Sequence, residues 1–202
     1  MESVFALLIA DRVGVFVFAI SGGIVAVRRD MDLFGVIVMA FLPAIGGGTL
    51  RDLILDVPVF WLSDTATLFL AVGGGLTAFL THRFLENFRP LRWADAMGMA
   101  LFAVTGAAKA AELNHGVAVV LIMGTMTASA GGLIRDVVAN QEPLLLKQDI
   151  YATAALLGSL VYFSVRAAGL DDGMAFIAGL ASGFALRGLA IIFKLSLPKS
   201  PF

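Results

Sequence analysis

The sequence contains no cysteine, only two histidines and few charged residues, which make up 14% of the chain. Without cysteine the chain has neither a disulfide framework nor a thiolate metal site. The formal net charge is −1, which offers no basic surface for nucleic acid, so we expect no nucleic-acid partner. The sequence has no Ser/His/Asp arrangement, no metal-binding cluster and no phosphate-binding loop. We therefore expect no enzymatic activity, no cofactor and no resident metal.

Apolar residues dominate instead, at 59% of the chain, and the mean hydropathy is +0.94. Several segments reach the length of about 20 residues that a helix needs to cross a bilayer. We predict an all-α membrane protein with seven transmembrane helices. The first lacks a basic segment ahead of it, which favours a retained span over a cleaved signal peptide. The expected spans lie at about residues 5–27, 33–55, 65–81, 93–111, 116–139, 150–165 and 174–193.

The sequence repeats itself. The motif GGGTLRD at residues 46–52 returns as GGLIRD at residues 131–136, at an offset of 84 residues (135 − 51 = 84). The same offset aligns DRVGVFVFAISG at 11–22 with DAMGMALFAVTG at 95–106. Each copy holds three spans, an odd number, so the second copy enters the membrane from the opposite side. We predict an inverted-topology repeat with an added seventh helix. The expected units are a first repeat at 1–81, a basic cytoplasmic linker at 82–92, a second repeat at 93–168, and the seventh helix with its tail at 169–202.

Glycine clusters predict breaks in the second and fifth long helices. A glycine in a helix interior costs about 1 kcal/mol relative to alanine, so a cluster needs a reason. One reason is close packing of membrane helices through small residues. The other is an unwound backbone that faces a water-filled path, and sites in inverted repeats tend to lie where such helices meet. The residues concerned are Pro43, Gly46, Gly47 and Gly48 in the first copy and Gly131 and Gly132 in the second.

Ionisable residues inside the spans mark either a pathway or buried pairs that fix helix packing. From their depth we predict an Asp11–Arg51 ion pair near the outer face and its mirror, Asp95–Arg135, near the inner face. Asp52 and Asp136 directly follow these arginines. Successive helical residues point about 100° apart, so we expect both carboxylates to have other partners. Lys109 either reaches the outer interface or faces a conduit.

Lysine and arginine are unevenly distributed between the two sides that seven spans define. Cytoplasmic loops of membrane proteins carry the excess of these residues, so the richer side is assigned as cytoplasmic. The N-terminus is then outside and the C-terminus inside. The basic residues of that side are Arg28, Arg29, Arg83, Arg89, Arg92, Lys147, Lys194 and Lys199.

The paired glycine–Arg-Asp motifs, the D-x-x-G-x-x-x-F-A-[IV]-[ST]-G copies ahead of them and the 3+3+1 pattern of spans resemble the bacterial TRIC (trimeric intracellular cation) channels. This resemblance covers nearly the whole chain. It implies a homotrimer in the bacterial inner membrane, surrounded by lipid, with one pore in each protomer. The pore would permeate K⁺, with Na⁺ as a second candidate ion. It would be lined by the broken second and fifth helices, with transient cation positions near Gly46, Gly47 and Gly131.

The second copy departs from the first in one respect. Ala130 stands in place of Gly46, and Thr127 in place of Pro43. Hydroxyls would then supply polarity to the path instead, from Thr125, Thr127 and Ser129.

The function we predict is a K⁺-permeable channel controlled by Asp/Arg pairs. One alternative is a secondary transporter of a small neutral solute such as glycine, which would use the repeat for alternating access. A third is a non-conducting scaffold whose ion pairs only hold helices together. The charges expected to line or gate the pore are Asp11, Arg51, Asp52, Asp95, Lys109, Arg135 and Asp136.

Overall fold

In the computed structural model, which describes residues 2–85, 90–146 and 150–198, the chain forms eight α-helices within these ranges. Seven are long and coincide with the predicted spans, and one short helix is added in the loop after the second span. Residues 86–89 of the predicted linker, and the basic residues Lys147 and Lys199, lie outside the described residues. The helices are α1 (Glu2–Val27), α2 (Leu33–Ile54), α3 (Phe60–Ser63), α4 (Thr65–Leu85), α5 (Pro90–Glu112), α6 (Val117–Val138), α7 (Ala152–Ala167) and α8 (Asp172–Phe193).

Helix ends correspond between the two copies. Asp30 and Asn114 follow α1 and α5 in the left-handed conformation, with φ of 53° and 61°. Asp56 and Asn140 do the same after α2 and α6, with φ of 53° and 50°. Asn and Asp tolerate positive φ better than other residues with side chains, which is why they end helices here. Both pairs are related by the offset of the sequence repeat.

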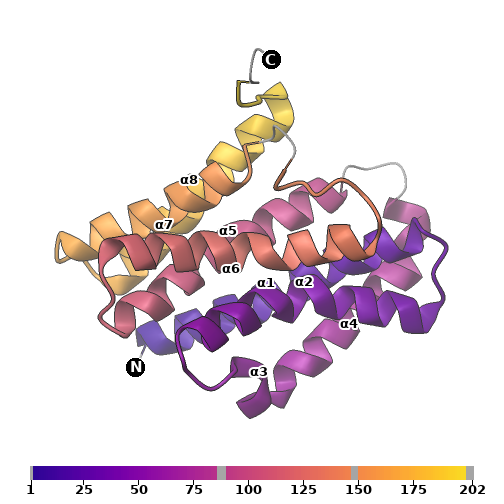
Figure 1. Cartoon of the computed structure of the whole chain (residues 1–202), viewed down its shortest axis with the longest axis horizontal. Coiled ribbons are helices and arrows are strands. Elements are labelled where there is room, and N and C mark those ends of the chain that lie inside the picture. The colour runs from indigo at the N-terminus through magenta and orange to yellow at the C-terminus, as the bar shows by residue number, and fades with distance from the viewer. Residues whose placement is uncertain (1, 86–89, 147–149, 199–202) are drawn as a thin grey trace.

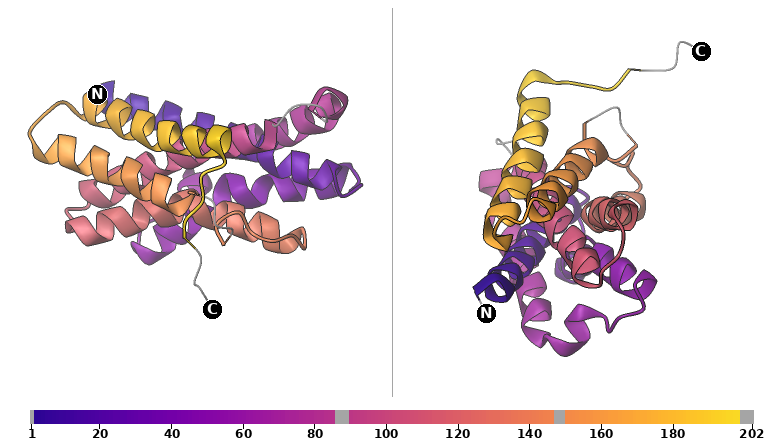
Figure 2. Two further views of the ribbon diagram at one scale, coloured as in Figure 1. Left: turned by 90° about the horizontal axis from the view of Figure 1, so that it is seen from above. Right: turned by 90° about the vertical axis from the view of Figure 1, so that its left-hand side faces the viewer.

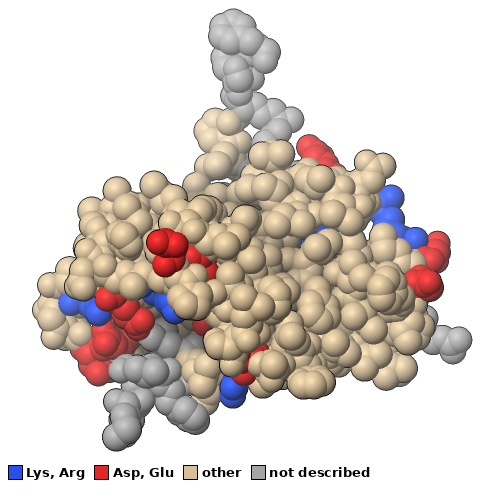
Figure 3. Space-filling model, turned by 60° about the horizontal axis from the view of Figure 1, so that its bottom comes forward, with Lys and Arg blue, Asp and Glu red and all other residues tan. Residues whose placement is uncertain are grey.

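The outer surface of the bundle suits a bilayer. Four helical segments, 8–27, 33–54, 117–138 and 172–193, are long and apolar enough to cross a membrane by length and composition. Shorter apolar helices lie at 65–81 and 152–167. In Figure 3 charged side chains gather mainly toward the two ends of the elongated molecule, and much of the surface between them carries no charge. Many large apolar side chains are exposed on the bundle. Burial of that surface in lipid explains why large side chains such as Phe34 and Phe69, about three-quarters exposed, point outward.

The two copies pack through corresponding helices. α1 lies against α5 and α2 against α6, while α8 and the α3–α4 pair lie at opposite edges of the bundle (Figures 1 and 2). Gly14 of α1 packs on the ring of Phe102, and Gly98 of α5 packs on the ring of Phe18. The two rings meet edge to face with centroids 5.1 Å apart. Reciprocal contacts of this kind are produced by a two-fold axis.

The same reciprocity holds between α2 and α6. Gly47 packs on the carbonyl of Thr127, and Gly131 packs on the carbonyl of Pro43. Residue numbers rise along one helix as they fall along the other, so the paired helices are antiparallel. The axis that relates the copies is therefore perpendicular to the long helices.

The predicted helix breaks are wrong for this structure. α2 is one continuous helix from Leu33 to Ile54, with Pro43 inside it, and α6 is continuous from Val117 to Val138. The glycines serve close packing instead. A Cβ at Gly47 would overlap the Thr127 carbonyl oxygen, and one at Gly131 would lie 2.5 Å from the Pro43 carbonyl oxygen. The helix-propensity cost of glycine is offset by the close approach of two backbones, as is common between membrane helices.

Candidate functional site: two buried arginine clusters

Arg135, near the end of α6, is the centre of a sealed polar cluster. Its Nη1 lies 2.6 Å from Asp95 Oδ1 and also donates to the Ser21 hydroxyl. The side chains of Arg135 and Asp95 are each 1% exposed. The predicted Asp95–Arg135 ion pair is confirmed. The cluster as a whole joins the two copies, because Ser21 belongs to α1 of the first copy. Ser21 was missed as a site residue, although the repeat offset aligns it with Thr105.

Asp136 binds the arginine that precedes it, contrary to prediction. Arg135 Nε lies 2.8 Å from Asp136 Oδ1, while Asp136 Oδ2 accepts the backbone N–H of Leu144 at 2.9 Å. Neighbouring helical residues do diverge by about 100° at Cβ, but an arginine side chain is long enough to bend back to its neighbour. The expected additional partner is also present, since the Gln141 amide donates to Oδ1 at 2.7 Å.

Arg51, near the end of α2, forms the corresponding cluster with different contacts. Its Nε lies 2.8 Å from Asp52 Oδ1, and Asp52 Oδ2 accepts the backbone N–H of Phe60 at 2.9 Å. The guanidinium carbon sits 5.7 Å from the centre of the Phe60 ring, a cation–π contact. The predicted Asp11–Arg51 ion pair is absent from the ion pairs of the described residues, so that prediction is wrong here. Arg51 still acts on Asp11 electrostatically, and the hydroxyl of Thr105 lies beside that carboxylate.

The Arg51 cluster borders a pocket of about 380 Å³, which we call the vestibule. Three of its lining residues, Leu8, Pro58 and Ser63, are exposed, so the vestibule reaches the surface. Lys109 lines it too, which favours the conduit-facing interpretation of that residue over the interfacial one. The lining residues are Leu8, Asp11, Arg12, Pro58, Phe60, Ser63, Asp64, Thr67 and Lys109.

A second ion pair closes one wall of the vestibule. Arg12 Nε and Nη2 donate to the two carboxylate oxygens of Asp64 at 3.1 and 3.2 Å. The sequence offers no signal for this pair, because Asp64 lies in a loop 52 residues further on. Sequence reasoning missed it for that reason.

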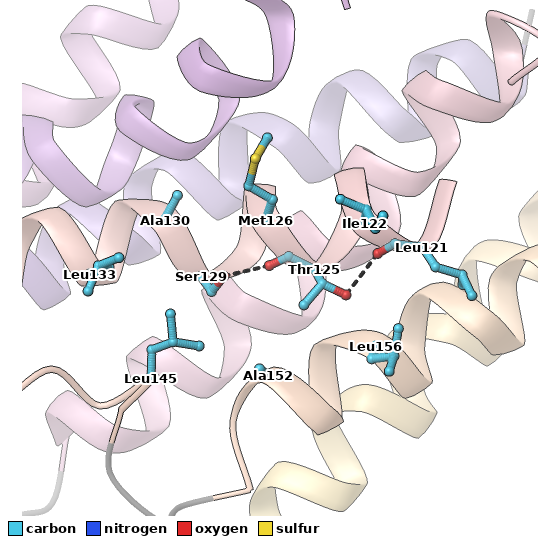
Figure 4. A pocket seen from close by; sticks show the side chains of 10 residues that line it. All are labelled: Leu121, Ile122, Thr125, Met126, Ser129, Ala130, Leu133, Leu145, Ala152 and Leu156. Carbon is cyan, nitrogen blue, oxygen red and sulfur yellow. Dashed lines mark hydrogen bonds between the residues drawn. The ribbon is translucent and has the colours of Figure 1, made fainter. Parts of the chain in front are cut away.

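The three hydroxyl residues of α6 do not share a face. Thr127 packs on Gly106 of α5 and donates to the Met123 carbonyl at 2.6 Å. Thr125 and Ser129 instead line an apolar pocket of about 440 Å³ between α6 and α7 (Figure 4). Their hydroxyls donate to the carbonyls one turn earlier, at 2.8 and 2.7 Å. Residues two apart on a helix point about 200° apart, so the three hydroxyls do not share one face, and their place along an ion path stays a prediction.

Sequence models of one family match both copies separately. The family described as "Glycine transporter" matches residues 8–83 and 92–167. A "UPF0126 membrane protein" of Vibrio cholerae is 38% identical over 198 residues, covering 95% of this chain and 82% of that protein. The "UPF0126 inner membrane protein YadS" of Escherichia coli is 39% identical over 200 residues, covering 93% of each chain.

Solved structures extend the comparison to the fold. A TRIC trimeric intracellular cation channel orthologue from Rhodobacter sphaeroides has a TM-score of 0.90 and 35% identity, covering 94% of this chain and 99% of that one. A structure that addresses conductance through TRIC cation channels has a TM-score of 0.87 and 38% identity, covering 96% and 97%. The fold and sequence together define a multi-pass bacterial inner-membrane protein. The chain belongs to the bacterial TRIC channel family, whose curated relatives are the UPF0126 membrane proteins, and the structures it resembles are channels and not enzymes.

Proposed function

We propose that the protein is a monovalent cation channel, permeable to K⁺, that assembles as a homotrimer with one pore in each protomer. The similarity to TRIC cation channels at 35% and 38% identity supports the class. A third similar structure, at 28% identity and a TM-score of 0.89, is of a prokaryotic TRIC channel in 0.5 M KCl. The observation that carries the proposal is the difference between the two arginine clusters: one borders an open vestibule and the other is sealed.

The proposed path starts at the vestibule and runs between α2 and α6 to the Arg135 cluster. The paired helices are antiparallel, so the two arginines lie toward opposite ends of the bundle. The close α2–α6 contact at Gly47 and Gly131 closes the path in this state, and opening requires the helices to separate there. Transient cation positions near Gly46, Gly47 and Gly131 then belong to the open state. In continuous helices, backbone carbonyls are already engaged in helical hydrogen bonds.

The Asp/Arg pairs control the charge that a passing cation meets. Arg135 is neutralised by Asp95 and Asp136, and Arg51 by Asp52. Loss of Asp95 would change the net charge of the Arg135 cluster from −1 to 0 and remove a carboxylate that attracts a passing cation. At about 6–8 Å and an effective dielectric constant of about 20, losing one negative charge makes the passage of a cation less favourable by roughly 2–3 kcal/mol.

The test is single-channel recording of the purified protein in a planar bilayer under a KCl gradient. We expect discrete, cation-selective openings in the wild type, and in Asp95→Asn a K⁺ current at least tenfold lower. The matched control is Asp172→Asn, because Asp172 forms an exposed pair with Arg166 at 3.5 Å, and it should conduct normally. Ser21→Ala, which keeps every charge, should also retain cation selectivity. Larger K⁺ currents in Asp95→Asn with unchanged selectivity would contradict the electrostatic role of the pair.

A second candidate function is supported by the vestibule itself. Asp11 and Lys109 line the same pocket with opposite charges, an arrangement that also suits a small zwitterion, and the matching family is described as a glycine transporter. A carrier would show saturable glycine uptake into liposomes and no unitary currents. Unitary K⁺ currents without uptake would exclude it.

We propose that the N-terminus faces outward and the C-terminus inward, which places the vestibule at the outer side. The absence of native cysteine makes the test simple, since each introduced cysteine is the single thiol. The exposed turn residues Asp30 and Asn114 suit substitution. A membrane-impermeant maleimide added to intact cells should label Asn114→Cys and spare Asp30→Cys. The reverse pattern would invert the assignment.

A further inference from the structure

The two arginine clusters are built from residues that correspond at the repeat offset, yet their arginines have different partners. In the second copy, Arg135 Nη1 contacts both the Asp95 carboxylate, at 2.6 Å, and the Ser21 hydroxyl. The corresponding acceptor groups of the first copy are Asp11 and Thr105. There the corresponding arginine forms an ion pair with Asp52 instead.

One substitution between the copies lies at the arginine that differs. Both arginines are held at Nε by the following aspartate, and both aspartates accept a backbone N–H eight residues further on. That residue is Phe60 in the first copy and Leu144 in the second. The Phe60 ring attracts the guanidinium of Arg51, whereas leucine offers no such contact. Arg51 thus has an aromatic contact that Arg135 lacks, and it forms its ion pair with Asp52, whereas Arg135 also binds Asp95.

This arrangement leaves an acidic and a hydroxyl oxygen together at the vestibule. Asp11 lines the vestibule and lies beside Thr105. Thr105 is only 4% exposed, and its hydroxyl lies beside the Asp11 carboxylate without reaching it, or another described residue, at full hydrogen-bond geometry. A buried hydroxyl without a partner is costly, so a ligand that contacts it is favoured.

We propose that Asp11 and Thr105 form a binding site for a monovalent inorganic cation, at the place that the Arg135 guanidinium takes in the other copy. The mirror cluster shows that the same two oxygen types hold one positive charge. Divalent ions prefer several carboxylates, and the described residues contain no group of three or more His, Cys, Asp or Glu that could hold a metal ion. The inference rests on the proposed function only in taking K⁺, the proposed permeant ion, as the ligand.

Two neighbours determine the strength of the site. Arg51 acts on the Asp11 carboxylate, and its pairing with Asp52 offsets that attraction in part. Lys109 lines the same vestibule and acts electrostatically on Asp11, so its positive charge weakens the binding of another cation at Asp11. The site should therefore be weak in the wild type and stronger when the charge of Lys109 is removed.

The test measures the melting temperature of the purified full-length protein as KCl replaces N-methyl-D-glucamine chloride at constant ionic strength. A ligand that binds the folded state raises this temperature with its concentration. We expect a K⁺-dependent rise that is lost in Asp11→Asn and weakened in Thr105→Val, while the control Thr125→Val keeps the full rise. Lys109→Gln should lower the half-maximal K⁺ concentration by roughly tenfold, because a nearby like charge is removed.

Phe60→Leu provides a second, independent variant, since it copies the residue of the other cluster. Arg51 should then bind Asp11 and compete with K⁺, which raises the half-maximal K⁺ concentration several-fold. A K⁺-dependent rise that is unchanged in Asp11→Asn and Thr105→Val would overturn the site, even if the wild type conducts K⁺ in a bilayer. A silent bilayer with a rise that these variants abolish would instead refute the channel and keep the site.

Discussion

Two adjacent glycines of α2 should respond in opposite ways to the same substitution. Gly46→Ala adds a methyl group whose nearest contact is the flexible end of Ile134, at 3.4 Å. Gly47→Ala adds the same group against the backbone carbonyl of Thr127, which belongs to another helix and cannot move independently. Both positions lie inside the continuous helix, so the gain in helix propensity is equal. The difference between the two variants therefore reports the helix contact alone.

The magnitudes follow from these contacts. Alanine replacing glycine in a helix interior gains about 1 kcal/mol, and Gly46→Ala should approach that stabilisation. Overpacking a filled contact costs about 1–3 kcal/mol, more where backbone must move, so Gly47→Ala should be destabilised by at least about 2 kcal/mol net. The gap is about 3 kcal/mol. At about 2–4 °C per kcal/mol for a chain of this size, it corresponds to roughly 10 °C in melting temperature.

The assay is thermal unfolding of the detergent-solubilised protein, with far-UV circular dichroism to check that helix content is unchanged. The second copy supplies an independent pair. Gly131→Ala should be destabilising because of the Pro43 carbonyl, whereas Gly132→Ala should be tolerated because its nearest contact is the Tyr151 hydroxyl at 3.4 Å. Equal melting temperatures within each pair would refute the assignment of these glycines to close packing. They would restore the interpretation of a locally unwound helix.

Three further outcomes can be checked. Asp95→Ala should lower the free energy of unfolding by about 3–5 kcal/mol in a denaturant titration, because Arg135 is left buried with one fewer partner. A loss below about 1 kcal/mol is the size expected for an exposed ion pair and would contradict a buried one. Thr127→Val should cost about 1 kcal/mol in the same titration, since its 2.6 Å hydrogen bond is lost; an unchanged stability would show that this buried hydrogen bond does not stabilise the fold. Thr125→Val and Ser129→Ala should leave the unitary conductance unchanged, because both residues line the pocket beside α7; a large reduction would put that face of α6 in the ion path.

Several features were predictable because they depend on local patterns. Seven long helices lie at the seven predicted apolar runs, and four of them are long and apolar enough to cross a bilayer. The depth of the charges predicted the Asp95–Arg135 pair, but the same argument predicted an Asp11–Arg51 pair that is absent from the ion pairs of the described residues, so depth alone does not select a partner. The Arg12–Asp64 pair was not predictable, since one partner lies in a loop whose position depends on the whole fold.

By itself the sequence determined the duplication. Equal spacing of two motifs and an odd number of spans per copy require that the copies be inverted, whatever their packing. Only the tertiary structure decided what the glycines and charges do. Gly47 suits a helix break as well as a helix contact, and the position of the Thr127 carbonyl selects the contact. Asp11 suits an ion pair with Arg51 as well as Asp95 suits Arg135, but in the fold Arg51 pairs with Asp52 and lies against the ring of Phe60 from another helix. In both cases the deciding group comes from another segment of the chain, because contact energies depend on where segments meet in space.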